Sequence, residues 1–118
     1  MAHAPTNLGD LVPLDRPPGS GSLIEVASGR VVEPGEYRAM VDAVARGLVA
    51  RGHQRGDRIG IIGLNSLNYV FAYLGIMKAG LVAVPINHRV PRSTVEHIVQ
   101  DAGVSLMPAG QAFKGLVP

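Results

Sequence analysis

The sequence of 118 residues contains no cysteine and no tryptophan, and aromatic residues make up only 4% of it. Without cysteine the chain forms no disulfide and offers no thiolate for catalysis or metal binding, and it fits a reducing compartment. We therefore expect a cytoplasmic protein. Charge is scarce as well: eleven Lys and Arg oppose nine Asp and Glu, and a net charge of +2 is too small to indicate a nucleic-acid partner.

Long uniform apolar segments are missing too. The longest apolar run, residues 67–86, is interrupted by Lys78, Gly80 and Pro85, so it does not predict a membrane span. The first fourteen residues lack the basic and apolar regions of a secretory signal. Hydrophobic residues nevertheless account for 47% of the chain, which is typical of a folded domain with a core.

What is present is an alternation of helical and strand-like patterns. Residues 1–22, rich in Pro and Gly, predict an irregular arm, and residues 23–27 and 30–32 flank a two-residue turn signal, Ser28-Gly29, that predicts a β-hairpin. The later elements are predicted as a helix from Pro34 to about Gly52, a strand at 58–63, a helix from Leu67 to Gly80, a strand at 81–86, a helix from Ser93 to Gly103 and a strand at 104–107. The fold class is therefore α/β: a partial doubly wound parallel sheet of about three strands with helices, preceded by the hairpin and the arm.

Capping signals mark the starts of the last two helices. Asn65 and Ser66 can cap the helix that begins at Leu67. Ser93 and Glu96 match a capping box, in which the hydroxyl accepts a backbone N–H and the carboxylate reaches back. The helix after Ser66 is expected to bury the apolar residues that recur at helical spacing: Leu67, Val70, Phe71, Leu74 and Met77.

Two glycine-containing segments raise the question of phosphate binding. Residues 60–63, Gly-Ile-Ile-Gly, end a predicted strand before a capped helix, which is the position of the phosphate loop in a dinucleotide-binding fold. The third glycine of that fingerprint is replaced by Ser66, and no acidic residue ends the next strand, so a small nucleotide-binding domain is kept only as an alternative. Gly19-Ser20-Gly21 follows no predicted strand and is interpreted as a flexible loop.

Other polar motifs have an ordinary structural interpretation. His97 and Asp101 are four apart on a predicted helix, and an exposed pair explains them better than a metal site. Arg55-Gly56-Asp57 matches an adhesion tripeptide but stands where the chain must turn into a strand. Asn87-His88-Arg89 follows the carboxyl end of a strand, where parallel sheets bind ligands, so both a solvated loop and a site remain open there.

Four segments form one pattern in order and spacing: residues 45–52, 56–61, 65–66 and 73–87. Within the last, Met77-Lys78-Ala79-Gly80-Leu81-Val82-Ala83-Val84-Pro85-Ile86-Asn87 is similar to a Lys-Ala-Gly core motif. Together, from about Ser22 onward, they resemble the N-terminal region of AMP-forming acyl-CoA synthetases, members of the AMP-dependent synthetase and ligase family.

The resemblance implies a two-step ligase. A carboxylate attacks ATP to give an acyl-adenylate and pyrophosphate, and the thiol of coenzyme A then displaces AMP, with Mg²⁺ assisting the first step. The family uses a phosphate loop that carries a Lys, a later acidic residue for the ribose and a Lys in the C-terminal domain, and none of these is found in this sequence. We therefore assign no catalytic, cofactor-binding or metal-binding residue, and Lys78 is interpreted as a helix-terminal cation.

By this resemblance, residues 23–118 are expected to be the truncated first part of the large N-terminal domain of such a synthetase, of fatty-acid or aryl-acid type. ATP, Mg²⁺ and coenzyme A are cofactors of the full-length family, with none expected for this chain alone. We expect the fragment to be inactive alone, because its sheet would keep open edges and apolar faces, and to pair with the remainder of the synthetase or a complementing fragment. The alternatives are a stand-alone interaction module that docks on a partner, or the small nucleotide-binding domain.

Overall fold

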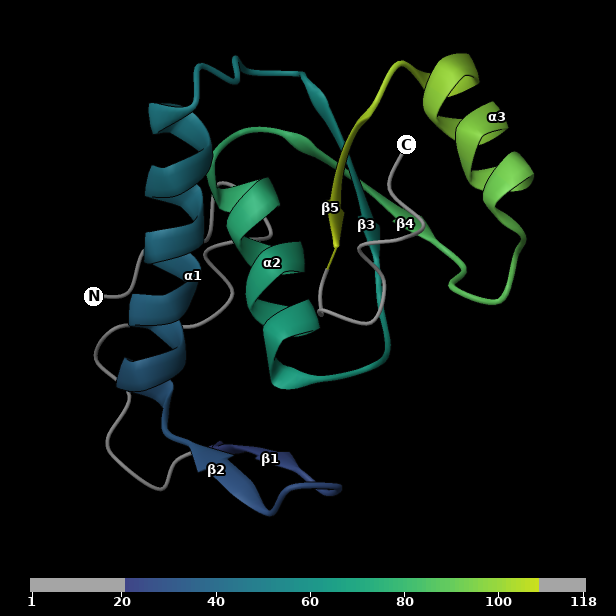
Figure 1. Ribbon diagram of the computed structural model, residues 1–118. Helices are drawn as coiled ribbons and strands as arrows, with labels where there is room; N and C mark the ends of the chain where they lie inside the picture. Colours follow the sequence, from purple (N-terminus) through teal and green to yellow (C-terminus); the bar gives the residue numbers. More distant parts are fainter. Residues whose placement is uncertain (1–20, 109–118) are drawn as a thin grey trace.

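Helices lie on both sides of a small parallel sheet, and a hairpin is attached at one end (Figure 1). The computed structural model describes residues 21–108, so the predicted arm lies outside the described residues except for its last two. In chain order the elements are β1 (Leu23–Glu25), β2 (Arg30–Val32), α1 (Pro34–Ala50), β3 (Arg58–Ile62), α2 (Leu67–Lys78), β4 (Val82–Ile86), α3 (Arg92–Ala102) and β5 (Ser105–Pro108). The predicted α/β fold with three parallel strands is confirmed. None of the helices among the described residues is long and apolar enough to cross a membrane.

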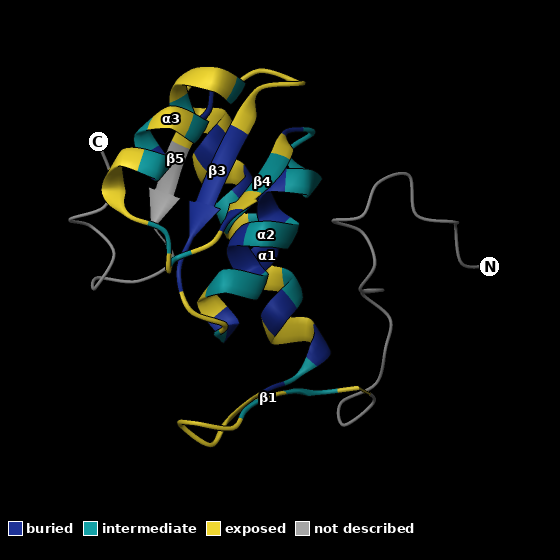
Figure 2. Cartoon of the chain, turned by 90° about the vertical axis from the view of Figure 1, so that its right-hand side faces the viewer, coloured by how far each residue is buried: buried dark blue, intermediate teal, exposed yellow. Residues whose placement is uncertain are grey.

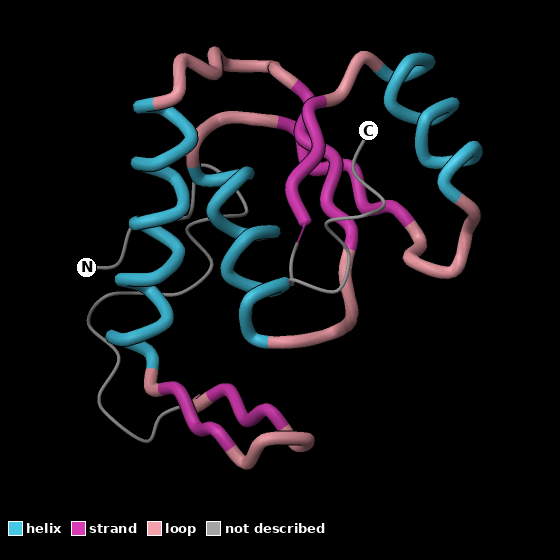
Figure 3. The backbone as a smooth tube through the Cα atoms, viewed as in Figure 1, coloured by secondary structure: helices cyan, strands magenta, loops and turns pink. Residues whose placement is uncertain are grey.

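The sheet has the strand order β4-β3-β5, with all strands parallel. Its central strand β3 is buried from Ile59 to Ile62, as expected of a strand that is covered on both faces. Helices α1 and α2 lie on one side of the three strands and α3 lies on the other (Figure 3). The sheet is therefore doubly wound, as predicted.

The hairpin has a longer turn than the sequence predicts. Strand β1 ends at Glu25, which pairs with Arg30, so four residues rather than two connect the strands. The N–H of Gly29 donates to the carbonyl of Glu25 at 2.8 Å, and Gly29 takes a φ of +72°, which a residue without Cβ adopts at little cost. The prediction of a Ser28-Gly29 two-residue turn is wrong because this wider loop satisfies the backbone groups at its base.

Helix α1 begins and ends where the sequence predicts. Pro34 occupies its first turn, where the missing N–H costs no hydrogen bond. The chain leaves the helix through Arg51 and Gly52, whose φ of +91° is left-handed. Its buried face consists of Pro34, Tyr37, Val41, Ala45 and Leu48.

Helix α2 buries only part of the face that its spacing predicts: Leu67 and Phe71 are buried as predicted, but the rest of the buried face is shifted. Val70, Leu74 and Met77 are half-buried, and the fully buried positions are Leu67, Phe71, Ala72, Gly75 and Ile76. The reason is the approach of α1: a Cβ added at Gly75 would lie 2.6 Å from the Cβ of Val44 and 3.1 Å from the carbonyl oxygen of Val41. Because α2 is apolar on most sides, its spacing alone does not choose the side that α1 covers.

Helix α3 lacks the predicted capping box. Pro91 precedes its first residue, and the N–H groups of Thr94 and Val95 donate to the Pro91 carbonyl at 3.0 and 3.2 Å. The helix thus starts one residue before Ser93, whose hydroxyl makes no capping bond, and Glu96 instead accepts a hydrogen bond from Arg92 at 3.0 Å. Gly103 ends the helix at a φ of +61°, as predicted.

The core is unevenly divided between the two faces of the sheet. The face toward α1 and α2 holds one cluster of Leu48, Ile59, Ile61, Ala72, Ile76 and Leu81. A second cluster joins the hairpin to the same helices through Val32, Tyr37, Val41, Leu67 and Phe71. The face toward α3 holds Ile62, Ile86 and Val95, and the outer side of α3 is exposed (Figure 2).

Candidate functional site

Polar side chains gather at both ends of helix α2. The first group, here called the amino-terminal cluster, consists of Glu25, Ser28 and Ser66. The second, here called the carboxyl-terminal cluster, consists of Arg38, Asp42 and Lys78. Helix termini carry partial charges, positive at the amino end and negative at the carboxyl end, and are therefore natural positions for charged groups.

The amino-terminal cluster satisfies backbone N–H groups in the first turn of α2. The Ser66 hydroxyl oxygen accepts the N–H of Tyr69 at 3.2 Å, which confirms the predicted cap. Glu25 Oε2 accepts the N–H of Leu67 at 2.9 Å, and the Ser28 hydroxyl donates to Glu25 Oε1 at 2.7 Å. A carboxylate of the hairpin therefore lies at the positive end of α2.

The electrostatics of Glu25 follow from these bonds. The hydrogen bond from the Leu67 amide, and next the one from Ser28, lower the pKa of Glu25; burial opposes them, and the charge of Arg30 lowers the pKa by the smallest contribution. The ionised form is thus favoured at neutral pH. Because its charge is negative, an external phosphate at the same helix end would be repelled.

The segment at residues 60–63, which the sequence leaves only as an alternative phosphate site, does not have the geometry of a phosphate loop. Gly60 is a buried residue inside β3, Gly63 is buried after it, and α2 begins only at Leu67. A groove of about 330 Å³ does run between β1 and the start of α2, and Glu25 is among its lining residues. Residues 60–63 therefore position a strand and a turn, and the geometry disfavours the nucleotide-binding alternative.

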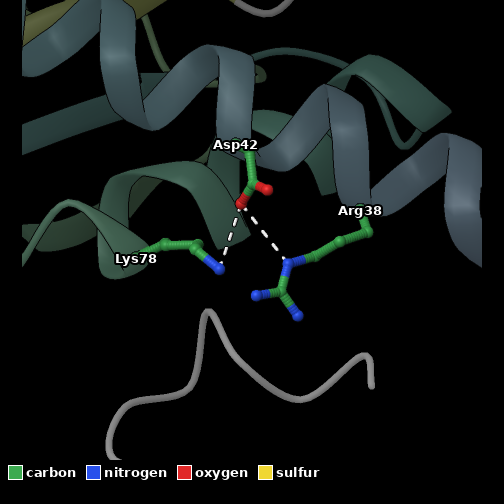
Figure 4. Close-up of polar contacts among 3 residues, drawn as sticks. All are labelled: Arg38, Asp42 and Lys78. Atoms are coloured by element: carbon green, nitrogen blue, oxygen red, sulfur yellow. Dashed lines mark hydrogen bonds and ion pairs between the residues drawn. The ribbon is translucent and has the colours of Figure 1, made fainter. Parts of the chain in front are cut away.

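The carboxyl-terminal cluster connects α1 to the end of α2 (Figure 4). One oxygen of Asp42, Oδ1, lies 3.0 Å from Nζ of Lys78 and 3.4 Å from Nε of Arg38. Lys78 is the last residue of α2, so the prediction of a helix-terminal cation is confirmed. Its ion pair with the neighbouring helix is an additional role.

Asp42 is held in its charged form despite partial burial. Burial raises the pKa of Asp42, but the hydrogen bond and the charge of Lys78, together with those of Arg38, outweigh it and hold the pKa below its ordinary value. An open groove of about 550 Å³ runs beside this cluster, lined by Asp42, Ala45, Arg46, Val49, Ala50, Lys78 and Ala79. Since the Asp42 carboxylate is already bonded to two cations, it is a structural anion here rather than a proton acceptor for chemistry.

The remaining sequence candidates belong to neither cluster. Asn87 Oδ1 accepts the N–H of Arg89 at 2.9 Å, so this segment forms a turn with its own polar groups. Asp57 Oδ2 accepts the N–H of Gln54 at 2.8 Å, and Gly56 has a φ of +88°, which confirms a turn at the Arg-Gly-Asp segment. His97 and Asp101 are exposed on α3. Gly19 and Ser20 lie outside the described residues.

Acidic side chains of the described residues make structural contacts and do not gather into a metal site. Between residues 21 and 108 the structure contains no group of three His, Asp or Glu side chains that could hold a metal ion. Glu25 and Asp42 are the two important carboxylates that the sequence did not single out. The four-residue spacing of Arg38 and Asp42 on a helix could have indicated their pair, whereas the contacts with Leu67 and Lys78 are set by tertiary structure.

Comparison with known proteins adds evidence beyond this geometry. The family model described as AMP-binding enzyme matches residues 18–114. The chain is 38% identical over 73 residues to surfactin synthase subunit 2 of Bacillus subtilis (strain 168), covering 62% of this chain and 2% of that protein. It is 34% identical over 91 residues to a 3-hydroxybenzoate–CoA ligase of Aromatoleum sp. (strain CIB), covering 77% and 17%.

The fold has a counterpart among solved structures. The N-terminal domain of FACL13 from Mycobacterium tuberculosis superposes with a TM-score of 0.73 and 28% identity, covering 79% of this chain and 23% of that one. The chain therefore spans between 2% and 23% of the length of these three matched chains, the last of which is itself an N-terminal domain.

Proposed function

Because the chain belongs to the family of AMP-binding enzymes, we propose that it forms the first part of the large domain of an adenylate-forming acid–thiol ligase. The observation that carries this proposal is the family match, which extends over residues 18–114 and so includes every described element. The family depends on ATP. In the complete enzyme an acid would be activated as its adenylate and passed to the thiol of coenzyme A, with Mg²⁺ neutralising phosphate charge.

The substrate is proposed to be a carboxylic acid of aromatic or fatty type. One relative is named as a ligase for an aromatic acid, and a second, from Streptomyces coeruleorubidus, as a fatty-acid ligase that uses an acyl carrier protein. Both are at least 33% identical to this chain over the matched residues, so neither class is favoured by identity. The described residues supply a scaffold for that reaction and not its reacting groups.

The chain alone is proposed to be inactive. Both polar clusters use their carboxylates to join α2 to other elements, and the positive end of α2 already carries Glu25. Catalysis of adenylation requires groups aimed at the phosphates and the attacking carboxylate. We therefore place the chemistry in residues of the remaining synthetase.

The remainder of the synthetase is also the proposed partner, because the sheet has two open edges among the described residues. Strands β4 and β5 each pair on one side only, with β3. The N–H of Val82 donates to the carbonyl of Asp57 in front of β3, so by alternation the backbone of Val84 also points to β3 and that of Pro85 points outward. Pro85 removes one donor from the β4 edge, and Val82, at the start of the same strand, exposes 46% of its surface.

An acid-dependent exchange of pyrophosphate into ATP tests the proposal. The 118-residue chain should show no exchange with benzoate-type or fatty acids. When the chain is mixed with a related ligase that lacks its own corresponding segment, exchange should appear. Exchange by the chain alone would overturn the proposed inactivity, and a stable complex without exchange would support the interaction module instead.

The interaction module remains a second candidate because the hairpin exposes apolar side chains. Ile24 and Val31 are cross-strand partners and are 64% and 51% exposed, and Val26 in the turn is 91% exposed. Such a group is a candidate contact surface. Co-purification with a protein unrelated to the synthetase, at this surface, would favour that function.

A further inference from the structure

The hairpin contacts the rest of the fold through two different kinds of interaction. Strand β2 is held by burial, since Val32 is fully buried between Tyr37, Val41 and Phe71. Strand β1 has little such burial, because Ile24 points to solvent and Leu23 is only half-buried. A polar contact therefore matters more for β1 than for β2.

Glu25 provides that polar contact with both of its oxygens. Oε2 accepts the Leu67 N–H, from a residue 42 positions away, and Oε1 accepts the Ser28 hydroxyl inside the turn. The Ser28 oxygen in turn accepts the N–H of Arg30 at 3.2 Å. One side chain thus bonds the turn, the strand and the first residue of α2 together.

The charged surroundings of Glu25 favour its ionised form. On β2, Arg30 is the nearby cation; it lies 3.6 Å from Glu36 of α1 and 6.0 Å from the centre of the Phe71 ring of α2. The first turn of α2 contains no acidic residue, so its positive end is offset by Glu25. These groups together make a negatively charged Glu25 the favourable partner of the Leu67 amide.

We propose that Glu25 is a latch: its carboxylate holds strand β1 and the turn at residues 26–29 on the amino end of α2, and this closes that helix end to external anions. The latch is a positioning contact within the chain and is independent of the ligase reaction. Together with the pairing of β1 with β2, it keeps a three-residue edge strand with an exposed outer face attached. It also explains why the amino end of this capped helix, which follows a parallel strand, does not bind phosphate: the Glu25 carboxylate already occupies it.

Amide hydrogen exchange by NMR on the 118-residue chain tests the latch. In Glu25→Ala the amides of Leu67 and of residues 26–30 should exchange about tenfold faster, as expected when a charge-assisted hydrogen bond is removed. Glu25→Gln, which keeps an acceptor oxygen, should give a smaller acceleration. Glu36→Ala is the matched control, because Glu36 pairs with Arg30 whereas the Leu67 amide donates to Glu25, and it should leave the Leu67 amide unchanged.

Two further measurements use the unsubstituted chain and so do not depend on how the variants fold. Lowering the pH should accelerate exchange at Leu67, after correction for the intrinsic rate, more than it accelerates exchange at the amides of β3. Since the folded pKa of Glu25 is lowered, the contact is complete above the ordinary glutamate pKa and is lost as the pH falls through the lowered value. Inorganic phosphate at millimolar concentration should not shift the Leu67 amide.

The proposal is overturned by any of three results. Equal exchange rates of the Leu67 amide in the unsubstituted chain and in Glu25→Ala would show that the carboxylate does not protect this amide or hold β1 on α2. Exchange at Leu67 that does not change with pH would show the same without a variant. A phosphate-induced shift at Leu67 in the unsubstituted chain would show that the helix end is open.

Discussion

The two faces of the sheet are covered by helices that the sequence predicts equally well but that pack very differently. On one face, α1 and α2 approach closely enough that Gly75 leaves no room for a methyl group beside Val44. On the other face, Val95 is the one buried residue of α3 among those described, and it rests on Ile62 and Ile86. Amphipathic spacing therefore predicts that a helix forms, but it does not predict how much of that helix is buried against the rest of the fold.

The difference indicates where the stability of the described fold is concentrated. Clusters on the α1 and α2 face join four elements and the hairpin, so a core substitution there should lower the stability of the whole described fold. The α3 face is a small cluster with half-buried neighbours, so a defect there should stay local. Substitutions matched in chemistry but placed on opposite faces can test this.

The largest effect is expected from Gly75→Ala. The added methyl would meet Val44 at 2.6 Å and the backbone oxygen of Val41 at 3.1 Å, so the helices must separate. We expect a loss of about 3 kcal/mol in the free energy of unfolding, measured by urea denaturation. Gly47→Ala on α1 is the control: nothing lies within 4 Å of its Cβ position, and it should stabilise by up to about 1 kcal/mol. Equal effects of the two variants would contradict close packing on this face.

The next effect separates global from local stability with one chemical change on each face. Val41→Ala and Val95→Ala each remove two buried methyl groups, and each should cost about 2 kcal/mol where it acts. Val41→Ala should lower protection against hydrogen exchange throughout the described fold. Val95→Ala should lower it in α3 alone, with β3 unchanged. If both variants lowered β3 protection to the same extent, the two faces would form one cooperative unit.

A smaller effect is expected from Asp42→Asn, which removes the charge that joins α1 to α2. The side chains of Asp42 and Lys78 are 29% and 20% exposed, so we expect a loss of about 1 kcal/mol at pH 7. Because the folded pKa of Asp42 is lowered, its contribution is present above the ordinary aspartate pKa and disappears as the pH falls through the lowered value. The variant should therefore match the unsubstituted chain in strong acid.

The matched control for this ion pair lies on the other face. Arg92 and Glu96 are 3.0 Å apart on α3, but their side chains are 54% and 45% exposed. Glu96→Gln should change the unfolding free energy by no more than about 0.3 kcal/mol, and added salt should remove even that. A loss as large as that of Asp42→Asn would mean that α3 is held as firmly as α2.

Local signals in the sequence were sufficient for the order of elements and for several of their ends. Pro34, Ser66 and Gly103 act through their own backbone or nearest N–H groups, so their effects can be derived without knowing the fold. The resemblance to AMP-forming synthetases rested on the order of short segments, including residues 77–87, and the family match over residues 18–114 supports it.

Features that depend on tertiary contacts could not be derived in the same way. The buried side of α2 is chosen by the approach of α1 to Gly75, and the attachment of Glu25 to Leu67 needs both elements in place. The turn at residues 26–29 is held by a hydrogen bond from the Ser28 hydroxyl to the Glu25 side chain and by one from the Gly29 N–H to the Glu25 backbone carbonyl. The polar clusters were therefore missed although each of their residues was visible in the sequence.

The last comparison is between two serines with nearly the same sequence signal. Ser66 accepts the Tyr69 N–H, so Ser66→Ala should cost about 0.5 kcal/mol, at the low end for a cap because Glu25 supports the same helix turn. Ser93→Ala should cost nothing measurable, because the Pro91 carbonyl already accepts the first N–H groups of α3. Paired urea denaturation curves, read with Thr94→Ala as a neighbouring control, distinguish the two sites. A cost at Ser93 equal to that at Ser66 would restore the capping box and would mean that α3 starts two residues later in solution, with Ser93 as its N-cap.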